Sequence, residues 1–376
     1  MFSLILTAGV ALMSAYFFWR FRAAFPRLGR GHLAVVGVLL VLATARLWGR
    51  AVGRLGLETL GEAAGIVLMI WMVLLFWFLW AGLALQAWNV LVKVGSKRLP
   101  ALQAVRLGPR RQFAVAAVLI AGASTWGWFE ARHVSTSHLT VEVDSLPDGR
   151  RSLRIAQISD VHVGSFQSRQ RLRAAIRLLR DLEPDLIVCT GDLVDGRIEK
   201  VGPLAEELGT VDAPLGKYAV LGNHEFYAGL EDSMAFLRTA GFRVLRQERV
   251  SPLPGLQIAG VDDPAARRRG LQPRLNEQAV LPPQGDPNVV VLLKHRPDVD
   301  AGSRGRFDLQ LSGHTHGGQV FPFGLLTKLA HEYCTGRHDL PGGSTLYVSR
   351  GTGTWGPPLR VGSPPEVTLI ELRAKR

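Results

Sequence analysis

The chain has 376 residues, with 44 Lys and Arg against 31 Asp and Glu, and a formal net charge of +13. This length is enough for two domains. Thirteen of the basic residues but only three of the acidic residues precede Ala131, so most of the excess charge belongs to the first third of the chain. The excess of basic residues is therefore poor evidence for a nucleic-acid-binding face. The two cysteines, Cys189 and Cys334, are too few for a disulfide framework or a zinc–thiolate site.

The first third of the chain contains four apolar stretches: Phe2 to Trp19, Leu33 to Trp48, Ile66 to Val92 and Phe113 to Phe129. A membrane-spanning helix needs about 20 mostly apolar residues. The alternative, a set of buried core helices, is disfavoured because so few acids accompany so many aromatic and branched residues. The second stretch is the weakest, because Arg46 interrupts it near one end, and a half-buried segment is an alternative there. The sequence therefore predicts a helical transmembrane region of about four spans over residues 1–130.

The basic residues in the connecting loops predict the orientation of these spans. The loops over residues 20–30 and 93–111 are rich in Lys and Arg, whereas Glu58 and Glu62 balance the basic residues of the loop between the second and third spans. An excess of Lys and Arg marks cytoplasmic loops. Four spans then place the N-terminus outside the cytoplasm, and the chain after Phe129 outside as well. We expect a multi-pass protein of the cell membrane.

From His138 onward, short apolar runs alternate with amphipathic segments, which predicts a layered α/β domain over residues 131–376. Helices are expected over Arg169–Leu182 and Leu230–Thr239, and loops over Ser251–Gly255 and Leu281–Pro287, where Pro and Gly cluster. The predicted strands are Leu139–Val143, Leu153–Ile158, Leu186–Thr190, Tyr218–Leu221, Leu256–Ala259, Val289–Leu293, Leu309–Leu311, Leu346–Val348 and Val367–Leu372.

Polar motifs follow five of these predicted strands directly. The residues in them that could bind a metal are Asp160, His162, Asp192, Asn223, His295, His314 and His316. Sites in open α/β sheets form beyond the carboxyl ends of strands, so we expect these side chains to share one site. Each motif alone is weak evidence, because a lone Asp-Val-His is more often a polar strand end and Gly-Asp is more often a turn. The five motifs together are specific.

The spacing within the motifs agrees with metal binding. Asp160 and His162 are two residues apart, so in an extended backbone they would face the same side, and His314 and His316 repeat this spacing. Glycine directly precedes Asp192, Asn223 and His314, which allows tight turns and close approach. A mixed set of Asp, His and Asn suits Mn, Fe or Zn better than Ca²⁺, which prefers oxygen ligands. The other five histidines are expected not to be ligands.

With all five motifs present in order, the chain from about Leu153 to its end resembles the calcineurin-like metallophosphoesterase family. The runs Gly313–Gln319 and Leu346–Gly351 resemble those of its membrane-associated or exported bacterial members. The resemblance implies a four-layer α/β/β/α sandwich that carries two divalent metal ions. It implies that Asp160, His162 and His316 hold one ion, that Asn223, His295 and His314 hold the other, and that Asp192 bridges them.

The resemblance also implies that His224 faces the substrate, as a proton donor or charge stabiliser for the leaving oxygen. Asp195 is expected to be structural or to support the ligands. Two metal ions can supply the nucleophile from water, and we find no Ser or Cys motif that offers a covalent one. The N-terminal region lies outside the core family fold.

The expected function is hydrolysis of a phosphodiester or pyrophosphate in a small-molecule or lipid-linked substrate at the membrane surface. A lipid-linked substrate is favoured by location alone. Two other classes stay open: a membrane sensor or scaffold with a degenerate phosphoesterase domain, and a nuclease. The intact set of candidate ligands disfavours the sensor or scaffold. The part of the chain after residue 130 is nearly neutral, and Arg267–Arg269 is its only dense basic cluster, which disfavours a nuclease and any nucleic-acid partner.

Overall fold

The computed structural model describes residues 2–165, 167–195, 201–271 and 276–375. The chain divides into two compact units, residues 1–126 and residues 127–376. Each unit is described by itself in the following paragraphs.

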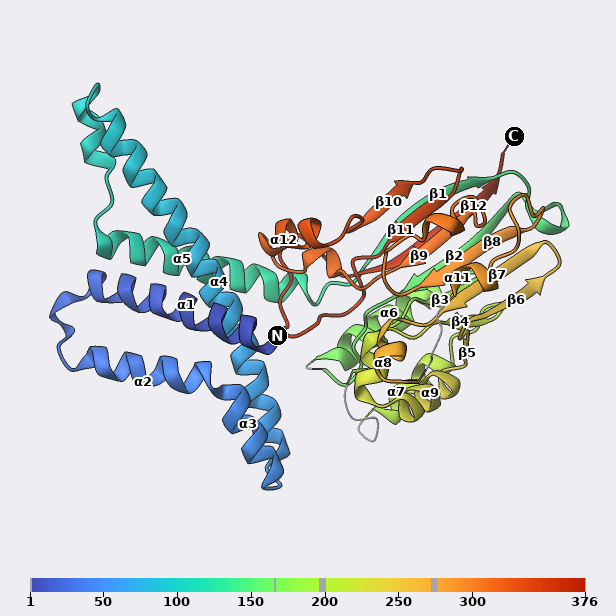
Figure 1. The fold of residues 1–376 in the computed structure, drawn as a ribbon, viewed down its shortest axis with the longest axis horizontal. Coiled ribbons are helices and arrows are strands. Elements are labelled where there is room, and N and C mark those ends of the chain that lie inside the picture. The colour runs from blue at the N-terminus through green and yellow to red at the C-terminus, as the bar shows by residue number, and fades with distance from the viewer. Residues whose placement is uncertain (1, 166, 196–200, 272–275, 376) are drawn as a thin grey trace. The chain divides into compact units, whose positions relative to one another are not determined.

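The first unit is helical (Figure 1). Its helices are α1 (Phe2–Ala24), α2 (Gly31–Ala43), α3 (Ala45–Arg54), α4 (Glu58–Gly95) and α5 (Pro109–Glu130), the last of which continues into the second unit. Edge-to-face and tilted contacts among Phe17, Phe78 and Phe113 join α1, α4 and α5. Such aromatic pairs contribute more than their buried area alone.

Two helices in the described part of the chain, α4 and α5, are long and apolar enough to cross a membrane. A third crossing is counted if α2 and Leu47–Arg54, bent by 61° from each other, form one broken span. This bend falls within the second predicted span, because the chain leaves the helical conformation at Thr44. The side chain of Arg46 lies outside the described part of the structure. The count of four spans and the orientation stay predictions.

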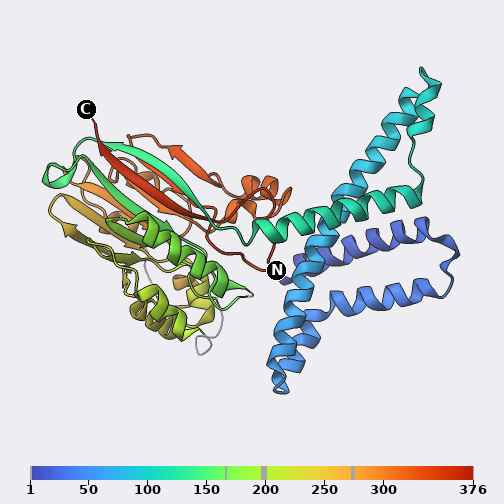
Figure 2. The same cartoon turned by 180° about the vertical axis from the view of Figure 1, so that it is seen from behind.

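The second unit contains two six-stranded sheets (Figures 1 and 2). The first has the order β1-β12-β2-β3-β4-β5 and the second the order β10-β11-β9-β8-β7-β6. The strands of the first sheet are β1 (Ser135–Val143), β2 (Ser152–Ile158), β3 (Leu186–Cys189), β4 (Lys217–Ala219), β5 (Arg243–Val244) and β12 (Glu366–Ala374). Those of the second are β6 (Glu248–Leu253), β7 (Leu256–Val261), β8 (Val289–Lys294), β9 (Leu309–Ser312), β10 (Gly336–Asp339) and β11 (Thr345–Val348).

Strand side chains alternate between two buried layers, as the period of two requires. In β8, Val289, Val291 and Leu293 belong to the core between the sheets, whereas Val290 and Leu292 belong to a core on the outer face of the second sheet. In β3, Cys189 is one of the residues on the outer face of the first sheet, and burial raises the pKa of its thiol. Both faces of these strands are buried, which explains their continuous apolar runs.

Helices cover the outer face of the first sheet, and a short helix adds to the outer core of the second. The first sheet is covered by α6 (Ser168–Leu182), α7 (Gly202–Gly209) and α9 (Leu230–Thr239), whose apolar residues share its outer core. The four-residue α11 (Glu277–Val280) adds Val280 to the outer core of the second sheet. The remaining helices are α8 (Asn223–Ala228), α10 (Ala265–Arg268) and α12 (Phe323–Ala330). The expected α/β class with two sheets and N-terminal apolar helices is confirmed.

The predicted loop at Ser251–Gly255 is wrong in its first half, because β6 continues to Leu253 and turns into β7 with a shift in register. Strands β5, β6 and β10 have no counterpart among the predicted strands. β5 has two residues and β10 alternates half-buried with exposed polar side chains, so neither carries an apolar run.

Candidate metal centre

The seven candidate ligands follow five strands whose carboxyl ends meet at one end of the two sheets. β2, β3 and β4 pair in parallel in the first sheet, and β8 and β9 pair in parallel in the second. Parallel strands bring the residues after them to the same edge. Asp160 and His162 follow β2, Asp192 follows β3, Asn223 begins α8 after β4, His295 follows β8, and His314 and His316 follow β9.

Three of these side chains, Asp160, His162 and His316, could hold one ion. The Nε2 atoms of His162 and His316 are 3.2 Å apart, and His316 Nε2 is 3.5 Å from Asp160 Oδ1. Two ligands that each lie about 2.0–2.1 Å from one tetrahedral ion are about 3.3 Å from each other. The donor atoms are therefore already spaced as the ligands of one cation.

A second group with the same spacing contains Asp192, His295 and His314. His295 Nε2 lies 3.1 Å from Asp192 Oδ2 and 3.1 Å from His314 Nδ1. Asp192 also forms a third possible group with His162 and His224. Asp192 therefore belongs to two of the three groups, as His162 does.

Asn223 has a buried side-chain oxygen that could bind a further ligand. Its Oδ1 has no hydrogen-bond partner among the described residues, although the residue is buried. An unsatisfied buried acceptor costs about 1–3 kcal/mol. The neighbouring His224 donates its backbone N–H to Asp192 Oδ1 at 2.8 Å, which holds this turn against the second group. An amide oxygen of this kind is a suitable ligand, so the residues present fit a two-metal centre.

The backbone at five of the candidate ligands is left-handed. The φ angles of Asp160, His162, Asp192, His314 and His316 lie between 50° and 72°. The expectation that each Asp/His or His/His pair faces one side because its backbone is extended is therefore wrong. The side chains converge because long-range hydrogen bonds hold tight turns, for example from Asp160 N to Gly191 O and from His162 N to Asp192 O, both at 3.0 Å. Such conformations cost of order 1–3 kcal/mol each and cluster at functional sites.

Two of the three glycines that precede ligands leave room for carboxylates. A Cβ atom on Gly222 would lie 2.2 Å from Asp192 Oδ1, and one on Gly313 would lie 2.2 Å from Asp160 Oδ2. Both distances are well inside van der Waals contact. The sequence pattern Gly-ligand therefore has a steric cause: the ligand of one loop approaches the backbone of the next.

A backbone carbonyl fixes the ring of His295, and charged side chains lie beside the rings of His162 and His316. His295 Nδ1 bonds the carbonyl oxygen of Thr190 at 2.9 Å, which leaves Nε2 for the ion. His162 Nδ1 lies 3.2 Å from Asp195 Oδ2. His316 Nδ1 lies 3.2 Å from Nη2 of Arg360, which is fully buried. Arg360 belongs to no motif in the sequence and is 44 residues away from His316, so the sequence did not indicate this contact.

Glu225 is a second residue that the sequence did not assign. It is fully buried, and its carboxylate accepts the backbone N–H groups of Asp192, Val194 and Gly222 at 3.0, 2.9 and 2.8 Å. It therefore ties the loop after β3 to the loop after β4. Burial raises the pKa of its carboxyl above the ordinary value. Its position directly after Asn223 and His224 was the available signal.

The charges of Asp192 and His295 in the second group stabilise each other when no ion is bound. Burial alone would raise the pKa of Asp192, but the imidazole of His295 holds it well below its usual value. Burial lowers the pKa of His295, but the carboxylate of Asp192 raises it, and the result is a pKa of about 10. Burial and the neighbouring His295 lower the pKa of His314 to about 2, so His314 keeps a free lone pair at neutral pH. A divalent cation would replace the proton on His295.

His224 lies beside these groups, and its ring is more open than those of His162 and His295. Its side chain is 15% exposed, whereas those of His162 and His295 are fully buried. Its Nδ1 lies 3.0 Å from Asp195 Oδ1, and its ring centroid is 6.4 Å from that of Trp355. Burial opposes protonation, but Asp195 and Asp192 raise the pKa of His224 to about 9. The imidazole can therefore carry a proton near neutral pH.

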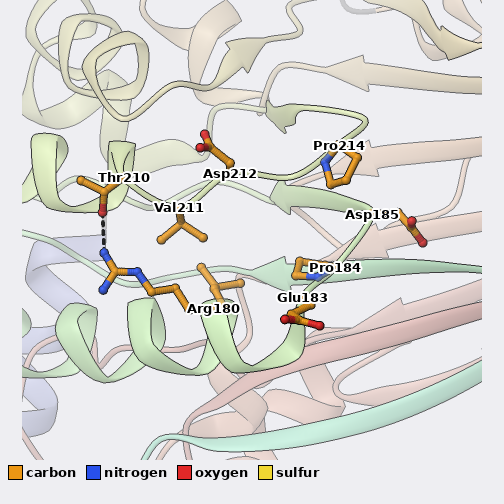
Figure 3. Close-up of a pocket in the computed structure, with 9 residues that line it drawn as sticks. Arg180, Glu183, Pro184, Asp185, Thr210, Val211, Asp212 and Pro214 are labelled. Atoms are coloured by element: carbon orange, nitrogen blue, oxygen red, sulfur yellow. Dashed lines mark hydrogen bonds between the residues drawn. The ribbon is translucent and has the colours of Figure 1, made fainter.

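A separate pocket of about 290 Å³ lies at the other end of β3 (Figure 3). Asp185, directly before the strand, and Asp212 are among its lining residues. This pocket contains none of the candidate ligands. The seven candidate ligands follow the carboxyl ends of their strands instead.

Comparison with known proteins identifies the second unit. The sequence pattern of the calcineurin-like phosphoesterase family matches residues 153–318. An uncharacterized metallophosphoesterase of Aquifex aeolicus is 42% identical over 237 residues, which are 63% of this chain and 90% of that protein. An uncharacterized metallophosphoesterase of Helicobacter pylori is 36% identical over 228 residues, 60% of this chain and 61% of the relative.

One relative also matches beyond the second unit. A Danio rerio protein named "transmembrane protein with metallophosphoesterase domain" is 31% identical over 299 residues, which are 76% of this chain and 68% of that one. The matched family segment, residues 153–318, includes all seven candidate ligands and His224. The chain belongs to the calcineurin-like phosphoesterase family, and it is a metal-dependent phosphoesterase.

Proposed function

We propose that this protein hydrolyses phosphodiester or pyrophosphate bonds at a membrane surface, in a lipid-linked or other small phosphorylated substrate. The observation that carries the proposal is the position of Asp192 in two metal-binding groups. The fold, the family and the buried donor set support it, and α4 and α5 supply helices able to hold the protein in a membrane. A site outside the cytoplasm, in a multi-pass protein, is the matching location.

The proposed roles start from the first and second groups, and Asn223 is added because of its unpaired side-chain oxygen. Asp160, His162 and His316 hold one ion; Asn223, His295 and His314 hold the other; and Asp192 bridges them. Bound Mn, Fe or Zn would polarise a phosphoryl oxygen and lower the pKa of a bound water. His224 gives its proton to the departing oxygen, and Asp195 orients the imidazole through Nδ1. Glu225 and the backbone turns hold the ligands before substrate arrives.

The chain offers no competing cysteine nucleophile, because Cys189 and Cys334 are both buried. Burial raises the pKa of both thiols, which opposes formation of the reactive thiolate. Hydrolysis by activated water is therefore the route that the described residues support.

The test is an activity panel on the full chain in detergent micelles, after loading with Mn²⁺, Zn²⁺ or Fe²⁺. Bis(p-nitrophenyl) phosphate, p-nitrophenyl phosphate, a nucleotide-linked diacyl lipid and single-stranded oligonucleotides cover the candidate classes. We expect metal-dependent cleavage of the diester or the lipid pyrophosphate. Turnover of the monoester alone, or of oligonucleotides in preference to the small diesters, would contradict the proposal. Metal binding without any turnover would favour a sensor or scaffold.

A further inference from the structure

Helix α12 (Phe323–Ala330) presents leucines to the outside of the second unit. Leu325, Leu326 and Leu329 are 54%, 43% and 86% exposed, and Lys328 beside them is exposed as well. The buried position of this helix is Thr327. A helix of a soluble domain normally turns its apolar side inward. Here the polar threonine faces inward and the leucines face outward.

α12 is fixed to the loop that carries two candidate metal ligands. A Cβ atom on Gly318 would lie 2.2 Å from the Cα atom of Gly324, so the helix backbone packs directly on the turn after His316. At the other end of the helix, the ring of His331 lies 5.6 Å from that of His314. The exposed leucines are therefore carried by an element that borders the candidate metal centre.

The same element lies close to the point where α5 ends. Within the second unit, Arg360 donates its backbone N–H to Gly127 O at 3.0 Å, and Ser363 donates its own to Glu130 Oε1 at 3.0 Å. The neighbouring Val361 O accepts from Phe321 N at 2.9 Å. One extended segment thus separates the last turn of α5 from the start of α12. The separation corresponds to two spacings between neighbouring strands, which amount to about 10 Å.

α5 is long and apolar enough to cross a membrane, and Trp126 and Trp128 lie near its end. Tryptophan concentrates where spanning helices leave the hydrocarbon. If the last turn of α5 lies at this level, α12 lies within reach of the lipid headgroups. A bilayer explains both the outward leucines and Lys328, whose ammonium can stay at the headgroups while its stem lies in the interface.

We propose that α12 is an interfacial docking element whose Leu325, Leu326 and Leu329 enter the bilayer and hold the mouth of the metal centre against the lipid surface. The inference rests on the proposed membrane placement of α5. It does not depend on which phosphoester is hydrolysed. It gives the catalytic unit a second attachment to the bilayer, in addition to the covalent link through residues 131–134.

The test uses the full chain in nanodiscs of phosphatidylcholine and phosphatidylglycerol, with one nitroxide label for each variant. Leu329→Cys tests the docking face. Leu271→Cys is the matched control, because Leu271 is a 46% exposed leucine of the second unit outside α12. Val118→Cys reports the middle of α5, where Val118 is 71% exposed. Cys189 and Cys334 are buried, and the labelled parent chain measures any background.

Collision with oxygen reports lipid, and collision with a water-soluble nickel chelate reports solvent. We expect the labels at positions 329 and 118 to favour oxygen and the label at 271 to favour nickel. Position 329 should lie about 5–10 Å below the headgroup boundary, as interfacial helices do.

If the label at position 329 is as accessible to nickel as the label at position 271, while the label at position 118 lies in lipid, the docking of α12 is refuted and the placement of α5 stands. Nickel access at 118 would overturn that placement, and docking with it. Shielding of 329 from both reagents, with spin–spin broadening that disappears on dilution with unlabelled chain, would assign the leucine face to a second copy of the protein and refute the bilayer as its occupant.

Discussion

The carboxylate of Asp195 lies 3.0 Å from Nδ1 of His224, while its other oxygen lies 3.2 Å from Nδ1 of His162. One side chain thus touches both a candidate metal ligand and the candidate proton donor. Burial would raise the pKa of Asp195, but the two imidazoles lower it well below its ordinary value, so the group stays a carboxylate. This negative charge lies within ion-pair distance of both rings.

Replacing Asp195 with Asn should therefore lower kcat by about 10–100-fold, the usual cost of losing such a supporting partner. Asp195 raises the pKa of His224, so the variant should also lose activity at a lower pH as His224 deprotonates. The check is a kcat–pH profile of both proteins, with Asp212→Asn, an exposed acid at the other end of the sheet, as control. Equal profiles for all three would remove Asp195 from this role.

Replacing His224 with Ala or Gln should lower kcat by roughly 10²–10⁴-fold, the range of general acid catalysis, while both metals stay bound. The loss should be smaller for a nitrophenol leaving group, which needs little protonation. Kinetics with good and poor leaving groups, together with elemental analysis, measure both effects. Loss of a metal in His224→Ala would instead make His224 a ligand, as its grouping with His162 and Asp192 would allow.

Replacing Asp192 with Asn should sharply reduce two-metal occupancy, because a neutral amide is a poor bridge between two cations. Asp185→Asn is the matched control, since Asp185 precedes the same strand, β3, at its other end. Elemental analysis of both purified variants gives the result directly. Two retained metals and unchanged turnover in Asp192→Asn would exclude the bridging role.

Metal affinity should rise with pH across the neutral range. Without an ion, Asp192 raises the pKa of His295 to about 10, so binding must displace a proton from that imidazole. Each lower pH unit makes this displacement harder. Calorimetric titration of the chelator-treated protein with Zn²⁺ or Mn²⁺ in buffers of different ionisation enthalpy counts the released protons. Affinity that is flat from pH 6 to 9, with no proton release, would contradict the expectation.

A reporter fused at Arg376 should report a position outside the cytoplasm, as the basic loops indicate. The second predicted span is the weak point, because the chain bends by 61° between α2 and Leu47–Arg54. Loss of that crossing would reverse every later segment. A fusion active only in the cytoplasm would therefore correct the number of crossings.

The sequence predicted the elements that carry their own local pattern. The apolar runs of β2, β3 and β8 locate the strands, and the residues directly after them locate the candidate ligands. It could not predict the left-handed backbone at Asp160 or His314, because hydrogen bonds from distant loops hold those turns. Arg360 escaped notice for the same reason, since its contact with His316 exists only in three dimensions. Asp195 was expected to have a supporting role, but its two partners became visible only in the structure.

The pairing of β1 with β12 constrains the order in which the second unit can be built. β1 (Ser135–Val143) is the first strand of this unit to be synthesised, and its neighbour in the sheet is the last, β12 (Glu366–Ala374), which also separates it from β2. The first sheet therefore cannot close until β12 has left the ribosome. Contacts of such long sequence separation slow folding and leave strand edges exposed meanwhile. Truncation by even one strand at the C-terminus would leave β1 without its partner.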